Sequence, residues 1–382
     1  MIVNFDNAAT TFPKPPEVRT AVEQAVARYG SAGRGSHALA VRGSEMIYAA
    51  REEIGAFFGA DPEHVVFTAN CTHALNLAIQ GLMRGGGHIV VSEYEHNSVL
   101  RPVYALAKSG KCRYSIAHVG ETDAETLGNF RKLLRPDTKA VVCTVCSNVT
   151  GEILPWQEIA KLCAGRGICF VADGAQGCGV LDISLKDGIN ILCTAGHKGL
   201  YGITGTGLLV TDGKFDFPPL MQGGSGSLSN LPEMPPFLPD ALESGTLNLI
   251  GAASLRAGVR FVKSKGTRHI FERETALCER FIQRLRAIPG VTVYRKDNRN
   301  YAPIVSFNIE GIPSEEVAAA LSRQGYCLRA GLHCAPLIHH AMGTETGTVR
   351  FSPSVHSRMQ DTLRLAEAVR SIAAHRGELD VS

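Results

Sequence analysis

The chain has 382 residues, of which 45% are hydrophobic and 20% are charged, with a formal net charge of +3. This length exceeds what one hydrophobic core usually organises, so two domains are expected, and the small net charge without a long basic run argues against a nucleic-acid or membrane-surface binder. The opening MIVNFDNAATT lacks the basic and apolar regions of a signal peptide, and no apolar stretch approaches about 18 residues, so neither export nor a membrane span is expected.

Strands and helices are predicted to alternate over the first two-thirds of the chain. Short β-branched or apolar runs predict strands, and apolar residues spaced three or four positions apart predict helices. Strands are expected at 64–69, 88–93, 112–119, 139–151 (running into a turn), 168–175, 190–197 and 205–212. Helices are expected between them, at 71–85, 97–110, 125–134 and 156–167. This alternation is typical of an α/β fold with a mostly parallel sheet covered by helices.

The last third of the chain has a different pattern. A loop rich in Gly, Pro and Ser at 217–240 precedes a long helix at 247–266. Beyond it we expect helices at 268–287, 314–325 and 358–375, and strands at 291–295, 302–309, 327–331 and 348–354. The sequence therefore predicts a large domain over 15–255 and a smaller α+β domain over 256–382, with residues 1–14 packing near the small domain and the active site.

Asp173 and Lys198 are the most informative pair in the sequence. Asp173 ends a predicted buried strand in CFVADGAQG, and Lys198 follows the next strand in CTAGHKGLYG. Separately, each has an ordinary explanation as a turn former or a solvated surface group. Together they match pyridoxal 5'-phosphate (PLP), because a lysine forms a Schiff base with its aldehyde and an aspartate pairs with its pyridine nitrogen. Gln176 is placed to contact a ligand held by Asp173.

Other polar residues also follow predicted strands, where ligands bind in parallel sheets. Thr72 lies at a strand-to-helix turn that suits a phosphate, although an ordinary helix cap explains the same residues. His96 follows the strand at 88–93 and suits stacking on a flat cofactor ring, although a hydrogen-bonded loop histidine is the simpler explanation. No Walker A or complete dinucleotide fingerprint is present.

Eleven cysteines are present, an odd number in a large chain. With no export signal, this favours free thiols in the cytoplasm. The pair Cys143 and Cys146 lies in an apolar strand, and positions i and i+3 of a strand face opposite ways. No second pair with zinc spacing follows, so these thiols are interpreted as structural and no metal site is predicted.

Cys334, in RAGLHCAP, is the candidate nucleophile. His333 and Arg329 are nearby, and positive neighbours favour the reactive thiolate form. One more buried thiol is the competing explanation. Arg350 lies 16 residues later between apolar Val349 and Phe351, where a bidentate pair with a substrate carboxylate would account for it.

Seven short motifs occur in order along the whole chain: FDNAATT, SEYEHNS, SNVTGEILP, VADGAQ, GHKGLYG, ESGTLN, and RAGLHCA followed by VRFS. With these motifs the chain resembles the cysteine desulfurase and selenocysteine lyase family, within the class V aminotransferases of PLP fold type I. The short R-x-G-x-H-C-A surround of Cys334 is similar to the branch with a compact cysteine loop.

The resemblance implies specific roles. Lys198 would carry PLP and move protons, Asp173 would pair with the ring nitrogen, and Gln176 would contact the ring hydroxyl. His96 would stack on the ring and act as acid or base. Phosphate contacts are implied for Cys71, Thr72, His197 and, from the partner subunit of a homodimer, Thr246. Substrate contacts are implied for Asn148 and Arg350 at the carboxylate and for Cys334 at the sulfur.

Two positions depart from the family pattern. Ala195 stands where a Ser or Thr hydroxyl often contacts the phosphate, and Thr194 is a possible substitute. Cys71 stands where Thr is common. Both changes are expected to affect cofactor affinity and leave the chemistry intact.

The implied reaction converts L-cysteine to L-alanine and leaves the sulfur on Cys334 as a persulfide, for delivery to a sulfur-acceptor protein that the sequence does not identify. L-selenocysteine is the alternative substrate, and an aminotransferase or another C–S lyase on the same fold is a further alternative. A module that has lost catalysis, and a zinc or redox protein built on Cys143 and Cys146, are the non-PLP alternatives.

Overall fold

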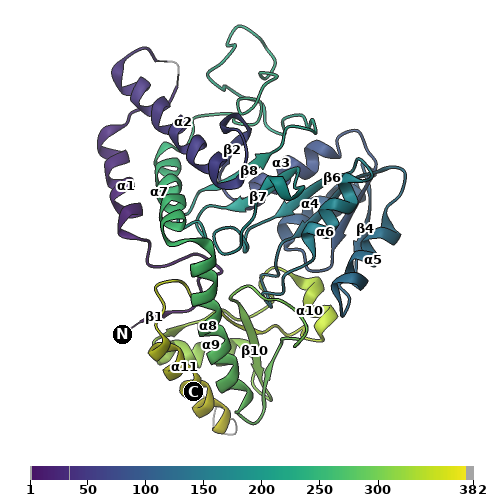
Figure 1. Cartoon of the computed structure of the whole chain (residues 1–382), viewed down its shortest axis with the longest axis vertical. Coiled ribbons are helices and arrows are strands. Elements are labelled where there is room, and N and C mark those ends of the chain that lie inside the picture. Colours follow the sequence, from purple (N-terminus) through teal and green to yellow (C-terminus); the bar gives the residue numbers. More distant parts are fainter. Residues whose placement is uncertain (1, 34, 376–382) are drawn as a thin grey trace.

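A seven-stranded sheet forms the centre of the larger part of the chain in the computed structural model, which describes residues 2–33 and 35–375 (Figure 1). The strand order is β2-β8-β7-β6-β5-β3-β4. The strands are β2 (Val65–Thr68), β3 (His88–Ser92), β4 (Arg113–Ala117), β5 (Thr138–Thr144), β6 (Cys169–Asp173), β7 (Ile191–Ala195) and β8 (Gly207–Thr211). Within this sheet, β8 runs in the direction opposite to that of the other six strands. The predicted α/β fold with a mostly parallel sheet is confirmed.

Helices cover both faces of this sheet. One apolar core joins a sheet face to α3 (Cys71–Leu82) and α4 (Asn97–Lys108). The core on the other face draws on α2 (Ala38–Phe58), α5 (Asp123–Leu133), α6 (Trp156–Ala164) and α7 (Leu249–Lys265). Successive residues of one strand serve opposite faces, as period-two alternation requires: Val142 packs in the first core and Cys143 in the second.

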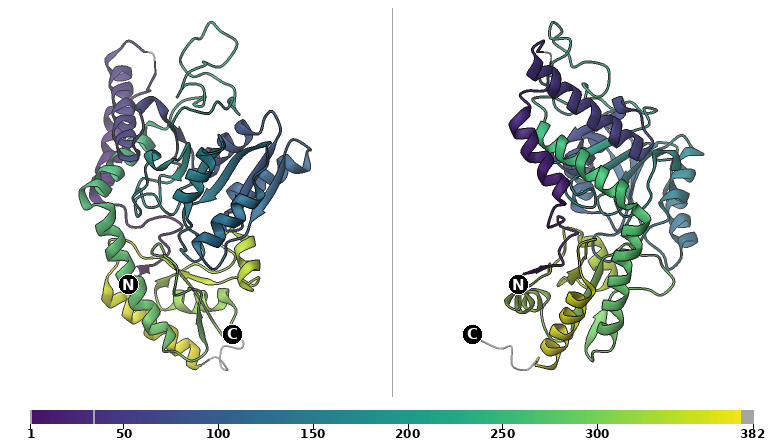
Figure 2. Two further views of the ribbon diagram at one scale, coloured as in Figure 1. Left: turned by 45° about the vertical axis from the view of Figure 1, so that its right-hand side comes forward. Right: turned by 60° about the vertical axis from the view of Figure 1, so that its left-hand side comes forward.

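The smaller part contains an antiparallel sheet in the order β12-β10-β9 and a two-stranded parallel pair, β1-β11. These strands are β1 (Val3–Asn4), β9 (Val291–Val293), β10 (Val305–Ile309), β11 (Tyr326–Cys327) and β12 (Val349–Phe351). One core packs them against α8 (Thr267–Arg286), α9 (Ser314–Arg323) and α11 (Met359–Ala374). Figure 2 shows the N-terminal strand beside this smaller part and away from the seven-stranded sheet.

The helices and strands differ from the sequence predictions in a few places. Three helices were not predicted: α1 (Pro16–Arg28), α2 and α10 (Pro336–Met342). The predicted strand 327–331 is wrong in length, because β11 ends at Cys327 and the chain turns toward Cys334. The predicted domain boundary at 255 and 256 falls within α7 and stays a prediction.

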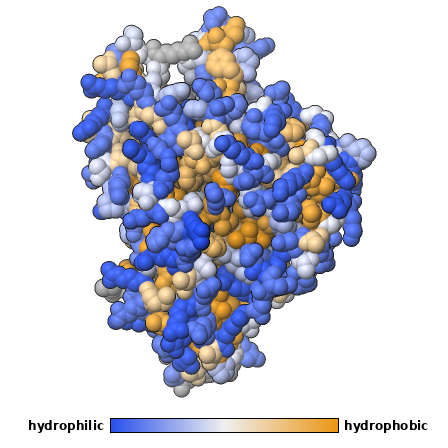
Figure 3. Space-filling view, viewed as in Figure 1, coloured by the Kyte–Doolittle hydropathy of each residue, from blue (hydrophilic) through white to orange (hydrophobic). Residues whose placement is uncertain are grey.

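A long irregular segment, residues 212–248, joins β8 to α7 and projects at the top of Figure 1. Four large apolar side chains on it are exposed, and apolar surface is visible at the same place in Figure 3: Leu220, Met221, Leu231 and Phe237. Within the described residues, no helix is both long and apolar enough to cross a bilayer.

Candidate active site

A pocket of about 100 Å³ opens at the carboxyl ends of the parallel strands. Its walls come from the segments that directly follow β2, β3, β5, β6 and β7, because the carboxyl ends of parallel strands meet at one sheet edge. The lining residues are Asn70, Cys71, Thr72, His96, Ser98, Thr144, Asn148, Asp173, Ala175, Gln176, Ala195, His197 and Lys198. Most of the residues singled out from the sequence are therefore brought together.

Lys198 lies in this pocket in the turn after β7. Burial lowers the pKa of its amine, and the nearby Arg350 acts in the same direction, whereas Cys71 and Asp173 oppose the shift. A lowered pKa increases the fraction of neutral amine, which is the nucleophilic and basic form. Burial at this site therefore favours a reactive lysine, and it outweighs the opposing effect of Cys71 and Asp173.

The backbone around Lys198 is held by the N-terminal segment. Thr11 N–H donates to the His197 carbonyl oxygen at 3.1 Å, and Thr10 Oγ1 donates to it at 3.0 Å. Thr11 Oγ1 also donates to the Lys198 carbonyl oxygen at 3.1 Å. Lys14 Nζ reaches the His197 carbonyl at 2.8 Å, and burial lowers the pKa of Lys14 to about 8. Two carbonyl groups of the lysine turn are thus fixed from outside.

Asp173 ends β6 with its carboxylate in the pocket. Its Oδ1 accepts the Ala175 N–H at 2.9 Å and the Cys71 thiol at 3.5 Å. Gln176 also lines the pocket, but its Nε2 donates to the Ala8 carbonyl oxygen at 3.0 Å, so its amide is partly engaged by the N-terminal segment.

The first turns of α3 and α4 point at the pocket and are joined to each other. Asn70 caps α3 by accepting the His73 N–H at 2.9 Å, and the Thr72 and Ser98 hydroxyls lie 2.6 Å apart. The N–H groups that open a helix have no partner inside it and attract anions, so two helix ends converge where a phosphate would fit. The Cys71 thiol is directed at Asp173, so a phosphate contact by this residue would use its backbone N–H, which opens α3.

His96 is the N-cap of α4. Its Nδ1 accepts the Ser98 N–H at 3.0 Å, so in the neutral ring the proton is on Nε2. Burial lowers the pKa of His96, and Asp173 opposes that shift. The ring is therefore neutral near pH 7, with an N–H that is not used by the cap.

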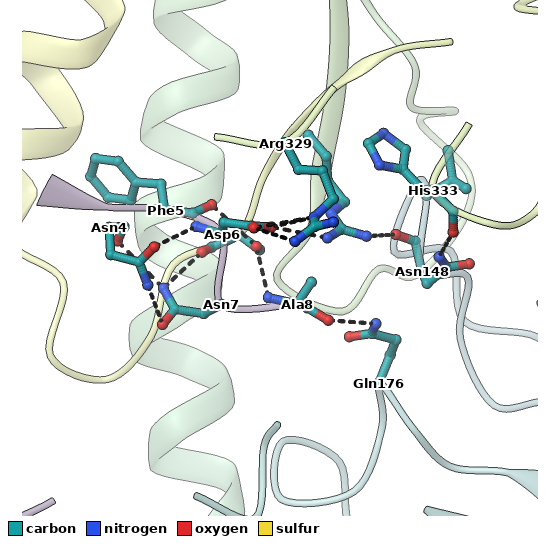
Figure 4. A network of polar contacts seen from close by, with 12 residues as sticks. Asn4, Phe5, Asp6, Asn7, Ala8, Asn148, Gln176, Arg329 and His333 are labelled. Atoms are coloured by element: carbon teal, nitrogen blue, oxygen red, sulfur yellow. Dashed lines mark hydrogen bonds and ion pairs between the residues drawn. The ribbon is translucent and has the colours of Figure 1, made fainter. Parts of the chain in front are cut away.

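Arg350 and Asn148 form the other polar group near the pocket. Figure 4 labels Asn148 together with His333 and Asp6. Arg350 is 3% exposed on β12, and its Nη1 donates to the Asn148 carbonyl oxygen at 2.9 Å. Asn148 Nδ2 donates to the His333 carbonyl oxygen at 2.7 Å. Arg350 Nη2 donates to Asp6 Oδ1 at 3.1 Å, which ties the group to the N-terminal segment.

Cys334 is exposed and lies at a groove of about 530 Å³ between α3 and α4. The groove shares His96, Thr72 and Ser98 with the pocket and continues past Arg101 to Lys111. His333 and Cys334 both have left-handed backbones, with φ of 48° and 58°. The cysteine loop thus adopts a specific turn beside the pocket.

His333 is not the positive neighbour that the sequence predicted. It is buried, its Nε2 contacts the Thr348 carbonyl oxygen at 3.0 Å, and burial lowers its pKa to about 2. The ring is neutral at physiological pH and does not favour the thiolate through its charge. Arg329, the other predicted neighbour, pairs with Asp6 at 2.9 Å.

Two further sequence expectations concern the phosphate. Thr194 is wrong as a substitute for the hydroxyl missing at Ala195, because it is fully buried and donates to the Gly174 carbonyl oxygen at 3.2 Å. Ala195 lines the pocket, and Thr194, the preceding residue of the same strand, faces the opposite side of the sheet. Thr246 is exposed and lies outside the pocket of its own chain.

Asp6 and Ser98 were missed by sequence reasoning. Both belong to motifs that were noticed: Asp6 is the second residue of FDNAATT, and Ser98 is the last residue of SEYEHNS. An isolated carboxylate after a short strand, and a serine two residues after a histidine, are too common to be singled out. Only their contacts with Arg350 and Thr72 make them informative.

Comparisons with known proteins agree with this geometry. The family model for class V aminotransferases matches residues 3–365. A probable cysteine desulfurase of Methanothermobacter thermautotrophicus is 31% identical over 96% of this chain and 94% of its own. The apo structure of a cysteine desulfurase from Thermococcus onnurineus NA1 superposes with a TM-score of 0.91 at 30% identity, covering 98% of this chain and 95% of that one.

A second solved structure gives the same result. The cysteine desulfurase CsdA of Escherichia coli has a TM-score of 0.87 at 26% identity and covers 100% of this chain and 96% of its own. The predicted family is thus confirmed at the levels of sequence and fold. This chain belongs to the class V aminotransferase family and is similar over nearly its whole length to proteins named cysteine desulfurase.

Proposed function

We propose that the protein is a PLP-dependent cysteine desulfurase that converts L-cysteine to L-alanine and takes the sulfur onto Cys334 as a persulfide. One observation carries the proposal. A pocket holding Lys198 and Asp173 meets, at His96, a groove that leads to an exposed thiol. Names of relatives at about 30% identity support the same activity.

The residues present fit PLP. Lys198 offers an amine with a lowered pKa, Asp173 offers a carboxylate, and the first turns of α3 and α4 offer N–H groups to a phosphate. Within the described chain, the buried His197 Nδ1 has no hydrogen-bond partner, which suits a ligand contact. The proposed holders are Lys198, Asp173, Gln176, His96, Cys71, Thr72, His197 and, across subunits, Thr246.

Arg350 and Asn148 are proposed to hold the substrate carboxylate. The Arg350 Nε is buried and has no partner within the described chain, so an N–H remains for a ligand. A guanidinium is the side chain best matched to a carboxylate, and the contact between Arg350 and Asn148 fixes its direction. This arrangement would orient an amino acid with its side chain toward the groove.

The chemistry divides among three side chains. Lys198 removes the Cα proton as a neutral amine, and bound PLP supplies an electron sink for the resulting carbanion. The Cys334 thiolate attacks the substrate sulfur, so an S–S bond forms while the substrate C–S bond breaks and its electron pair stays on carbon. His96 Nε2–H and the Lys198 amine are placed to return protons. L-cysteine and one enzyme thiol thus give L-alanine and one enzyme persulfide.

The decisive experiment compares wild type with Cys334→Ser, incubated with L-cysteine. Mass spectrometry should find one added sulfur on Cys334 in the wild type and none at that position in the variant, with alanine formation abolished. Persulfide and alanine formation at the parent rate in the variant would sink the assignment. A parallel arm with L-selenocysteine tests the alternative substrate, because a variant that stays active on it alone identifies a selenocysteine lyase.

We also propose an acceptor for the sulfur, an oligomeric state and a cellular compartment. The exposure of Cys334 on a groove lined by Arg101 and Lys111 suits delivery to an acceptor protein. Exposed Thr246 and the apolar side chains of segment 212–248 suit a homodimer interface. All eleven cysteines are free, which suits a reducing compartment such as the cytoplasm.

A further inference from the structure

Asp6 occupies the guanidinium that the proposed function assigns to the substrate carboxylate. Its Oδ1 accepts an N–H of Arg350 Nη2 at 3.1 Å. It is held in place because residues on both sides of it are fixed: Phe5 N–H donates to the Cys327 carbonyl oxygen at 2.9 Å, and Ala8 N–H donates to Ser352 Oγ at 2.9 Å. The contact therefore belongs to the fold of the N-terminal segment.

The hydrogen-bond inventory of Arg350 shows what remains for a ligand. Nη1 is engaged by the Asn148 carbonyl oxygen at 2.9 Å and Nη2 by Asp6, whereas Nε is buried without a partner in the described chain. A bidentate carboxylate needs two parallel N–H groups of one guanidinium. Nη1 and Nη2 each keep a second N–H, so a bidentate substrate contact through Nε and Nη2 would place the substrate carboxylate beside Asp6 on the same guanidinium. The two negative charges would then repel each other unless Asp6 moves away from Nη2.

Arg329 gives Asp6 an alternative partner. Arg329 Nε contacts Oδ1 at 3.2 Å and Oδ2 at 3.1 Å, and its Nη2 contacts Oδ2 at 2.9 Å. Arg329 is half exposed, whereas Arg350 is 3% exposed. Asp6 thus retains a two-pronged ion pair if it leaves Arg350. One carboxylate against two guanidiniums also leaves one uncompensated positive charge, which matches one substrate carboxylate.

We propose that Asp6 is an internal competitor for Arg350 that sets the affinity of the site for a substrate carboxylate. In the free protein it compensates a buried guanidinium. On binding it moves away from Nη2 and keeps its ion pair with Arg329, while the substrate takes Nη2 and Nε. The inference rests on the proposed function only in taking Arg350 as the carboxylate-binding residue. Removing the negative charge of the competitor strengthens binding, because it ends the repulsion between the two carboxylates and raises the local positive charge.

The test measures binding of the product L-alanine and of L-alaninamide, which lacks the carboxylate, to the PLP-loaded protein by calorimetry. Asp6→Asn should bind alanine about tenfold more tightly than wild type, the order of effect expected when one nearby negative charge is removed. It should bind alaninamide no more tightly than wild type. Alanine should also raise the Tm of Asp6→Asn more than that of wild type, since tighter binding to the folded state stabilises it further.

Arg329→Gln supplies the opposite change. It removes the second partner of Asp6, so the carboxylate stays on Arg350, and alanine binding should weaken by about threefold or more. Asp297→Asn is the matched control, because Asp297 also pairs with an arginine, Arg286, at 3.1 Å on the surface, and neither residue lines the pocket. It should leave both affinities unchanged.

Two results would overturn the inference: alanine bound by Asp6→Asn with wild-type or weaker affinity, or bound by Arg329→Gln with wild-type or greater affinity. If Asp6→Asn does not fold, Arg329→Gln alone decides. The opposite signs separate this role from a merely structural one, which would weaken binding in both variants. Failure of the proposed function is distinguishable, because alanine binding is measured whether or not Cys334 forms a persulfide.

Discussion

The Asn97 N–H donates to the Cys334 carbonyl oxygen at 2.7 Å. Asn97 is the first residue of α4, and His96 is its N-cap, so the candidate acid or base and the thiol-bearing residue are attached to the same helix end. The left-handed backbone at His333 and Cys334 costs free energy that neighbouring contacts must offset. This hydrogen bond is one such contact, and it ties the position of the cysteine loop to the start of α4.

Substitution of His96 should separate capping from catalysis. His96→Ala removes the side chain that accepts the Ser98 N–H, so we expect the free energy of unfolding to fall by about 1 kcal/mol. His96→Asn keeps a capping oxygen and should retain stability. Both variants should lose alanine formation from cysteine, because neither has the Nε2–H. Urea unfolding and a product assay check the two effects, and parent-rate turnover by His96→Asn would exclude His96 from the chemistry.

His333→Asn should reduce the loss of unfolding free energy that occurs as the pH falls below 6.5. Burial lowers the pKa of His333 to about 2 in the folded protein, against about 6.5 when unfolded. As the pH falls, the unfolded chain therefore protonates this ring while the folded protein keeps it neutral. The free energy of unfolding is then lost below pH 6.5 at about 1.4 kcal/mol per pH unit. Asparagine tolerates the left-handed backbone that His333 adopts. Urea unfolding from pH 4 to 7 checks the slope, and equal slopes in both proteins would refute the neutral-histidine assignment.

The sequence predicted the central sheet well because its strands are short apolar runs bounded by turns, and such runs are readable locally. Lys198 and Asp173 were found for a related reason, since both follow buried strands. Asp6 could not be identified as a site residue from the sequence, because its role depends on a contact with Arg350, 344 positions away. The same holds for His333, whose lack of charge comes from burial against Thr348 and not from its sequence neighbours.

Substitution of Glu274 should act in the opposite pH range. Glu274 on α8 is buried in a small cavity that also borders Lys198 and Tyr201, and burial raises its pKa to about 8. A raised carboxyl pKa gives stability that is complete below about pH 4.5 and is lost as the pH rises through 8. In the wild type the free energy of unfolding should therefore fall by about 1.4 kcal/mol per pH unit over this range, and Glu274→Gln should not show this fall. The variant should be the more stable protein at pH 8.5.

The pH range 7–8 isolates this effect, because it lies above the unfolded pKa of His333 and because His333 is intact in both proteins. Unfolding free energies of wild type and Glu274→Gln should diverge steadily across it. Glu95 is also buried with a pKa raised to about 8, and it is intact in both proteins, so its contribution cancels in the comparison. Parallel curves would show that Glu274 is ionised in the folded protein.

Thr246 gives the sharpest test of the proposed dimer. It is exposed and absent from the pocket of its own chain, so it can serve the cofactor only from a partner subunit. Lys198→Ala and Thr246→Val should each be impaired alone. In a mixed dimer, the Lys198→Ala subunit supplies Thr246 to the intact lysine of its partner and restores one of two sites. Random one-to-one mixing should then recover about a quarter of wild-type activity in a symmetric dimer. Recovery of no activity after verified subunit exchange would place Thr246 outside the catalytic site.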